Sequence, residues 1–178
     1  NQEENLQTIN DKAFFECSRL NDVALPNSTL RIDKEAFRHC TSLSNISLGK
    51  SLNFINEYAF ADCPVLDNLK FPETLKSIQT AAFINDAALG SITFPAGLQG
   101  IGAAAFSNCT ALKQTTFETY NSTLTVGMGA FNNCTAMEKV NIAHLDSWAH
   151  INFSDETANP TSQAHHLFMD GAEITDAF

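Results

Sequence analysis

A 23-residue repeat constrains the fold of this chain more than any other sequence feature. The dipeptide Ala-Phe occurs six times, with four intervals of 23 residues and a last interval of 25. The alanines are Ala13, Ala36, Ala59, Ala82, Ala105 and Ala130. Each unit has Ile or Val four residues before the alanine, and five of the six have Cys four residues after it. One unit cannot bury its apolar side chains alone, so we expect the units to stack around one continuous core.

Each unit is expected to contribute one short strand and one tight turn. After the cysteine position comes Leu or Met, followed by a segment of alternating apolar and polar residues that is typical of a half-buried strand. Pro26, Pro72 and Pro95 follow three of these segments and prevent the strand from continuing. The segment from Ala-Phe to the cysteine is too short for a regular helix. We expect a turn or 3₁₀ element there, with the phenylalanine inside.

The pattern predicts an α/β-type solenoid of the leucine-rich repeat kind. We expect a right-handed coil of about six units over residues 1–142, with a parallel sheet of short strands and little true helix. Residues 143–178 contain the only Trp, four of the five His, and no Lys or Arg. We expect an irregular cap there, with Trp148 and Phe153 covering the last coil and a hairpin turning at Asp170–Gly171. We also expect the natural chain to continue beyond this sequence.

Composition argues against two classes of partner. The chain has ten Lys plus Arg against twenty Asp plus Glu, which gives a formal net charge of −10 at pH 7. Nucleic acids and anionic membrane surfaces are bound by basic faces, so we expect neither as a partner. No apolar run in the sequence approaches the roughly 18 residues of a membrane span, so we expect no membrane insertion.

The cysteines and histidines suggest little chemistry. All five cysteines occupy one repeat position and form a line along the coil, so we expect reduced structural thiols and no metal site. Asp86 takes that position in the fourth unit and must lie at the surface or accept hydrogen bonds from backbone N–H groups. His165 and His166, with Asp170, lack a dedicated zinc-binding spacing. A surface pair is the favoured interpretation and a zinc or enzyme site is the alternative. We expect no cofactor and no catalysis.

The outward positions of the predicted sheet form the first candidate binding surface. They flank the central apolar residue of each strand and therefore point away from the core. They are Asp22, Ala24, Asn45, Ser47, Asn68, Lys70, Ser91, Thr93, Gln114, Thr116, Lys139 and Asn141. This polar strip has no aromatic residue, whereas interface hot spots are usually Trp, Tyr or Arg. We therefore expect weak contacts that gain strength by repetition.

The fifth unit is irregular and provides a second candidate. It has two more residues than the regular units, so we expect a protruding loop at Tyr120 and Asn121. Thr115 stands where the other units have an aliphatic residue, so we expect the sheet to be loosened there.

The repeats resemble the BspA-like leucine-rich repeats of bacterial surface proteins, chiefly of the Bacteroides type. The resemblance rests on six copies of I-x-x-x-A-F-x-x-C-x-x-L-x-x-I-x-L-P within residues 6–142. In the tail it rests on Trp148, Phe153, Asn159–Pro160 and Asp170–Gly171, in that order. It implies a secreted or surface-anchored, non-enzymatic module, which we expect to be a monomer. The implied partner is a protein or glycan, including host matrix proteins for some members. The alternative is a structural spacer within a longer surface protein.

Overall fold

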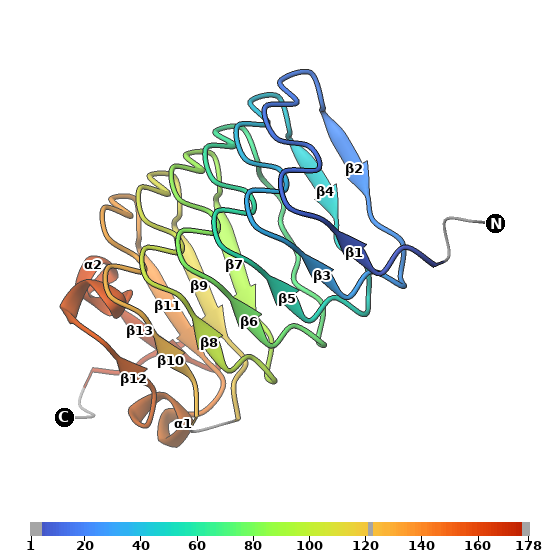
Figure 1. Cartoon of the computed structure of the whole chain (residues 1–178). Coiled ribbons are helices and arrows are strands. Elements are labelled where there is room, and N and C mark those ends of the chain that lie inside the picture. Colours follow the sequence, from blue (N-terminus) through green and yellow to red (C-terminus); the bar gives the residue numbers. More distant parts are fainter. Residues whose placement is uncertain (1–4, 121–122, 176–178) are drawn as a thin grey trace.

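The computed structural model describes residues 5–120 and 123–175, which form a solenoid of stacked turns (Figure 1). Parallel strands from successive turns lie side by side along the axis, and the two short α-helices of the described residues lie at the C-terminal end. The predicted leucine-rich repeat coil of parallel strands with little helix is therefore confirmed.

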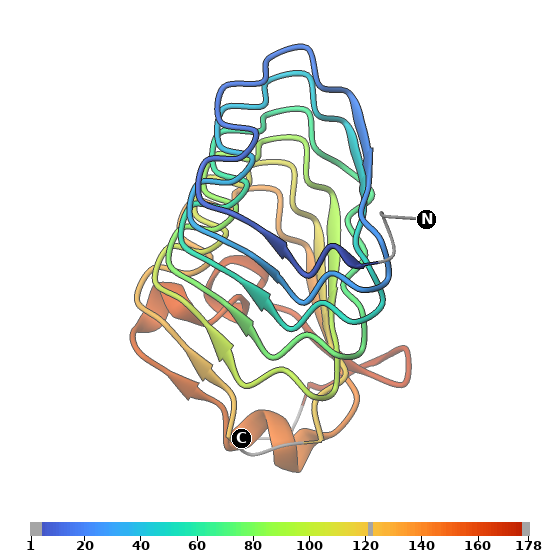
Figure 2. The same cartoon turned by 45° about the vertical axis from the view of Figure 1, so that its right-hand side comes forward.

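The larger sheet has seven parallel strands in the order β1-β3-β5-β6-β8-β10-β12. These are β1 (Thr8–Ile9), β3 (Arg31–Ile32), β5 (Phe54–Ile55), β6 (Ser77–Ile78), β8 (Gly100–Ile101), β10 (Thr125–Val126) and β12 (Asn152–Phe153). In this sheet, every strand except β12 ends on the buried Ile or Val that lies four residues before the alanine of Ala-Phe. The repeat pattern predicts only one sheet, because two-residue strands are too short to show an alternating pattern. A second row of strands lies on another side of the coil, as Figure 2 shows.

The second row holds the strands that the sequence predicts, but it is not continuous. Its first part pairs β2 (Asp22–Ala24) with β4 (Asn45–Ser47). Its second part contains β7 (Ser91–Phe94), β9 (Gln114–Phe117), β11 (Lys139–Ile142), β13 (Leu167–Met169) and β14 (Ala172–Glu173). In this second row, the third unit contributes no strand between β4 and β7, since β5 and β6 belong to the larger sheet. The strand expected between Asn68 and Lys70 in this unit is therefore absent.

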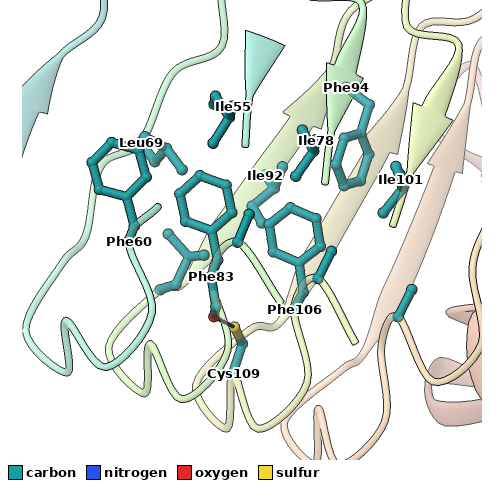
Figure 3. Packing of buried hydrophobic residues seen from close by; sticks show 14 of the residues in the cluster. Ile55, Phe60, Leu69, Ile78, Phe83, Ile92, Phe94, Ile101, Phe106 and Cys109 are labelled. Carbon is teal, nitrogen blue, oxygen red and sulfur yellow. Dashed lines mark hydrogen bonds between the residues drawn. The ribbon is translucent and has the colours of Figure 1, made fainter. Parts of the chain in front are cut away.

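Stacked phenylalanines fill the interior. The rings of Phe14, Phe37, Phe60, Phe83, Phe106 and Phe131 form a column in which neighbouring centroids are 4.9–5.6 Å apart and the planes differ by at most 9°. All but Phe14, in the first turn, are fully buried. Phe94 packs edge-on against Phe106 with the centroids 5.5 Å apart. Figure 3 shows this packing and the aliphatic residues around it. The predicted position of these phenylalanines is confirmed from the second unit onward.

The Ala-Phe segments form hydrogen-bonded turns, as expected. Two residues in each unit, one before the alanine and one three after it, have positive φ values between 52° and 67°. At the second position, side chains of adjacent turns form a ladder. Asn85 donates to Asp62, Asn108 to Asn85 and Asn133 to Asn108, with N–O distances of 2.7–2.9 Å. Asparagine suits this position because its side chain tolerates the left-handed conformation and bonds to its neighbours.

The cysteine column is a packing element. Cys40, Cys63, Cys109 and Cys134 are buried, and each Sγ donates to a phenylalanine carbonyl of the preceding turn over 3.1–3.3 Å. Cys17, in the first turn, is exposed. All five cysteines lie among the described residues, and none is in a disulfide. Burial raises the pKa of Cys40 to about 11 and that of Cys134 to about 12, so both remain thiols at neutral pH.

Asp86 lies in the same column and is completely buried. Its Oδ1 accepts a hydrogen bond from the Cys63 N–H over 2.8 Å, as the sequence interpretation requires of an aspartate there. Its Oδ2 has no hydrogen-bond partner. Burial raises the pKa of Asp86 well above its ordinary value, and the nearby Asp62 adds to the effect. The chain therefore tolerates this residue at a cost in stability.

The C-terminal segment continues the coil and does more than cover it. It contains α1 (Leu145–Ala149), β12, a 3₁₀ helix (Glu156–Ala158), α2 (Thr161–Ala164) and the β13–β14 hairpin. β12 adds a strand to the larger sheet, and β13 adds one to the second row. The Phe131 N–H donates to the Thr157 carbonyl as the Phe106 N–H donates to the Ala130 carbonyl. The buried Ala158 therefore stands at the phenylalanine position of an added turn, so the cap contains one regular turn beside its hairpin.

Candidate binding surface

The polar strip predicted from the sequence follows the outer face of the second row. Its residues from Asp22 to Thr93 are exposed, whereas those from Gln114 to Asn141 are half-buried. The C-terminal part makes contacts within the chain. The Lys139 Nζ lies 4.9 Å from the centroid of the Phe168 ring. The Asn141 side chain donates to Thr116 over 3.5 Å. The part most available to a partner is therefore the N-terminal half of the strip.

The break in the second row starts at Asn68. Its φ is +53°, a left-handed conformation that asparagine adopts more readily than most residues. Its N–H donates to Oδ1 of the preceding Asp67 over 2.7 Å, which removes that N–H from the sheet. Among the described residues, no backbone hydrogen bond joins residues 68–71 to β4 or β7. The side chain of Leu69 still packs in the core, so the turn remains in the stack although its strand is lost.

Two neighbouring hollows open on the strip at this break. The first has a volume of about 550 Å³ and is lined by Asn45, Ile46, Ser47, Leu48, Asn68 and Lys70. The second has a volume of about 320 Å³ and lies toward Thr93, Glu73 and Glu118. Asn68 and Lys70 line both hollows. Ligand sites commonly occupy hollows of this size, so the break is the part of the strip where a ligand could be enclosed.

Lys70 is the cation at this place. In residues 5–120 and 123–175, no carboxylate forms an ion pair with its ammonium group. The residues that line the first hollow include no acid, whereas the second hollow, which Lys70 also lines, has Glu73 and Glu118. The first hollow therefore favours an acidic group in a ligand.

The irregular fifth unit differs from one expectation. Thr115 is buried in β9, which pairs regularly with β7 and β11, so the expected loosening of the sheet at Thr115 is wrong. Hydrogen bonds of the backbone hold the strand despite the polar side chain. Tyr120 is 69% exposed, and its ring centroid lies 4.5 Å from that of His144. Asn121 lies outside the described residues.

Two histidines of the tail, His150 and His166, each contact one acidic residue. The His166 Nδ1 lies within hydrogen-bond distance of Glu173, across the β13–β14 hairpin. His165, at the end of α2, has a positive φ of 57°. The described residues include no group of three or more His, Cys, Asp or Glu that could hold a metal ion. Within this described part of the chain, none of the helices has the length and apolar composition of a membrane span.

Sequence reasoning places the strip correctly on the coil but misses the break. The sequence gives little indication of the break, because Leu69 and Phe71 keep the alternating pattern of a strand. Asp67–Asn68 is the pair that could have indicated it. Asparagine tolerates positive φ, and a preceding aspartate can accept its N–H.

A scan against protein-family models identifies the repeat. The model for the BspA type leucine-rich repeat region matches with six copies, over residues 1–113 and 76–158. The chain belongs to the BspA-type leucine-rich repeat family. No curated protein matches this BspA-type sequence significantly.

Solved structures with the same fold come from several bacteria. A leucine-rich repeat protein from Bacteroides ovatus is 27% identical, with a TM-score of 0.68 over 76% of this BspA-type chain. The T. pallidum leucine-rich repeat protein is also 27% identical, with a TM-score of 0.71 over 76% of the chain. The pneumococcal vaccine antigen PcpA is 20% identical, with a TM-score of 0.59 over 68%, and shares the fold. The matches cover 34%, 65% and 30% of those three proteins, respectively.

Proposed function

We propose that this chain is a non-catalytic, extracellular binding module that recognises a protein through the N-terminal half of its polar strip. The observation that supports the proposal most is the exposed, repeated row of polar side chains between Asp22 and Thr93, which opens into hollows at Asn68. The resemblance to bacterial surface proteins supports an extracellular location. Host matrix proteins are the first partners to test, because the resemblance names them for some members.

The composition of the strip favours a protein over a glycan. Sugar rings are usually bound by stacking on exposed aromatic side chains, and the strip between Asp22 and Thr93 has none. Serine, threonine and asparagine side chains can donate and accept hydrogen bonds from a polypeptide. Such contacts are individually weak, so binding strength is expected to come from their number along the coil.

The test measures binding of the whole chain to a panel of purified host matrix proteins by biolayer interferometry. Lys70→Glu and Ser47→Arg change the strip, and Thr125→Glu is the matched surface control on the larger sheet, where Thr125 is exposed. We expect each strip variant to weaken binding by about tenfold or more and the control to leave it unchanged. Equal losses in all three variants, or no loss in the strip variants, would contradict the proposal. Absence of binding to every panel member would favour the spacer alternative.

A further inference from the structure

The larger sheet has an open outer face. Figure 1 shows its strands β5, β6 and β8 with no helix lying over them. In every strand of this sheet except β12 the second residue is buried, so the first residue points outward. In spatial order, the outward row is Thr8, Arg31, Phe54, Ser77, Gly100, Thr125 and Asn152. The polar strip lies on another side of the coil (Figure 2), so the outward row is a separate surface.

Phe54 projects from the outward row. Its side chain is 45% exposed, whereas the column of phenylalanine rings is fully buried from Phe37 onward. Its neighbours in the row, in register on the adjacent strands, are Arg31 and Ser77. Aromatic residues and arginine are enriched at protein interfaces, and the polar strip has no aromatic residue. The outward row therefore has the side chains of an interface that the strip lacks.

A third hollow lies beside Phe54 on the same face. It has a volume of about 200 Å³, and its lining includes Ser77, Gly100, Gly102 and Thr125. Gly100 takes the place in β8 that Phe54 takes in β5, two strands away. Since glycine has no side chain, the row is depressed there, and a phenyl ring can enter the hollow. One face therefore carries both a projecting ring and a depression that can receive it.

The ring and the depression are placed symmetrically about β6. Ser77 is in register with Phe54 on one side and with Gly100 on the other. When two sheets face each other, a two-fold axis along β6 places Phe54 of each copy over Gly100 of the other. Sheets packed face to face lie about 10 Å apart, so a ring from one sheet can approach the backbone of the other where no side chain stands. The surface is therefore complementary to a second copy of itself.

The charges of the outward row permit this pairing. The chain has a formal net charge of −10, yet Arg31 is the only charged residue of the row. Asp33, in the same turn, pairs with Arg31 over 3.1 Å. The two-fold axis along β6 places Arg31 opposite Thr125 of the second copy, so like charges do not meet. Elsewhere the excess of acidic residues opposes association, which makes this row the favoured face for self-association.

We propose that two copies of this chain associate through the outer faces of their larger sheets, with Phe54 of each copy inserted into the hollow at Gly100 of the other. The dimer replaces the monomer expected from the family resemblance. It goes beyond the proposed function and does not depend on it, because the polar strip remains outside the interface. A dimer presents two strips, so weak contacts to a partner gain strength by repetition.

The size of the face sets the strength of the dimer. Seven strands about 4.8 Å apart give a face roughly 30 Å long. The face is only one short strand wide, so the buried area falls below about 1,200 Å² in total, which is typical of weak and transient complexes. We therefore expect a dissociation constant of roughly 10–100 μM.

The first experiment measures the mass of the whole chain by sedimentation equilibrium at concentrations up to about 1 mM. Phe54→Gly removes the ring and Gly100→Phe fills the hollow, so each should weaken the dimer about tenfold or more. The double variant exchanges ring and hollow, and the two-fold symmetry predicts that it restores the dimer. A Cβ at Gly100 would lie 3.7 Å from Ser77 Oγ, an ordinary contact, so the sheet tolerates the substitution.

Val65→Gly is the matched control for these variants. Val65 is 43% exposed, close to the value for Phe54, and lies outside the larger sheet. It should dimerise as wild type does. A wild-type chain that stays monomeric throughout, an equal loss in Val65→Gly, or a double variant that fails to recover would overturn the proposal.

The second experiment does not depend on how the variants fold. Isotope-labelled and unlabelled wild-type chains are mixed at a concentration where the dimer predominates. Isotope-filtered NMR should then show nuclear Overhauser effects between the ring protons of Phe54 and the α protons of Gly100 of the other copy. Their absence in a sample that is dimeric by sedimentation would refute this arrangement.

The two proposals can fail separately. If wild type stays monomeric but Ser47→Arg abolishes binding of a matrix protein, the strip is used and the dimer is wrong. If the dimer forms but no matrix protein binds, the dimer stands and the proposed function is wrong. Thr125→Glu remains a valid control for the strip, because it places a carboxylate opposite Arg31 and should keep the dimer. Thr125→Arg should weaken the dimer by like charge, and an unchanged dimer would contradict the facing of these two positions.

Discussion

Replacing Asp86 by cysteine should stabilise the chain, and the gain should increase with pH. Asp86 is completely buried, one carboxylate oxygen has no partner, and burial raises its pKa well above the ordinary 3.8. Below about pH 3.8 the carboxyl group is protonated in both the folded and the unfolded chain, so its ionisation does not change the free energy of unfolding. Above that pH the unfolded chain loses the proton while the folded chain keeps it, so folding becomes less favourable. Asp86→Cys removes this loss and restores the column of thiols.

The size of the effect follows from proton linkage. The free energy of unfolding of wild type should fall, relative to Asp86→Cys, by about 1.4 kcal/mol per pH unit until the pH reaches the folded-state pKa. Over two pH units above the unfolded-state pKa, this amounts to about 3 kcal/mol. Other carboxyl groups titrate in both proteins, so the difference between the two isolates Asp86.

The assay is urea unfolding of both proteins at about pH 4.5, 5.5 and 6.5, followed by circular dichroism. Asp86→Asn is the control, because it keeps an oxygen that can accept from the Cys63 N–H but cannot ionise. The free energy of unfolding of each variant, relative to wild type, should rise with pH by the same slope. Asp86→Asn should be less stable overall than Asp86→Cys, because its amide is a buried polar group. A stability difference between Asp86→Cys and wild type that stays constant with pH would refute the reasoning.

Three further predictions concern the packing of the coil. Phe83→Ala opens a cavity in the middle of the ring column and should lower the free energy of unfolding by about 3–5 kcal/mol in urea titrations; a loss below about 1 kcal/mol would contradict the packing. Gly102→Ala would place a Cβ 2.4 Å from the Thr80 backbone nitrogen, so thermal unfolding should show a destabilisation of about 1–3 kcal/mol, whereas Gly171→Ala meets no atom within 4 Å and tests only its positive φ. In the native chain, Cys17 alone should react rapidly with a thiol reagent, and the four buried cysteines only on unfolding; rapid reaction at several thiols, counted by mass spectrometry, would contradict their burial.

The hollow at Asn68 could be only partly predicted from the sequence. Asn45, Ser47, Asn68 and Lys70 are outward residues by the alternation of each unit, and they line the first hollow as neighbours. The hollow itself depends on hydrogen bonds that residues 68–71 do not make with β4 and β7. The alternating pattern at Leu69 and Phe71 predicts burial of side chains, and both burial and pattern persist when the backbone pairing is lost. A side-chain pattern therefore does not report this break.

The sequence by itself determined the stacking of the turns. Ala-Phe, the cysteine position and the following leucine recur in every unit with little variation, so each unit buries the same side chains against its neighbours. The phenylalanine column and the thiol column follow from that repetition alone.

Only the tertiary structure decided where backbone hydrogen bonds form between turns. It formed the larger sheet, which the sequence does not predict, at residues such as Ile32 and Ile55, where two-residue strands show no alternating pattern. It built an added turn in the tail, where Ala158 takes a phenylalanine position without sequence similarity to one. It also opened the row at Asn68. The reason is that a backbone hydrogen bond joins groups every residue carries, so pairing between turns depends on the conformation of both partners and not on which side chains they bear.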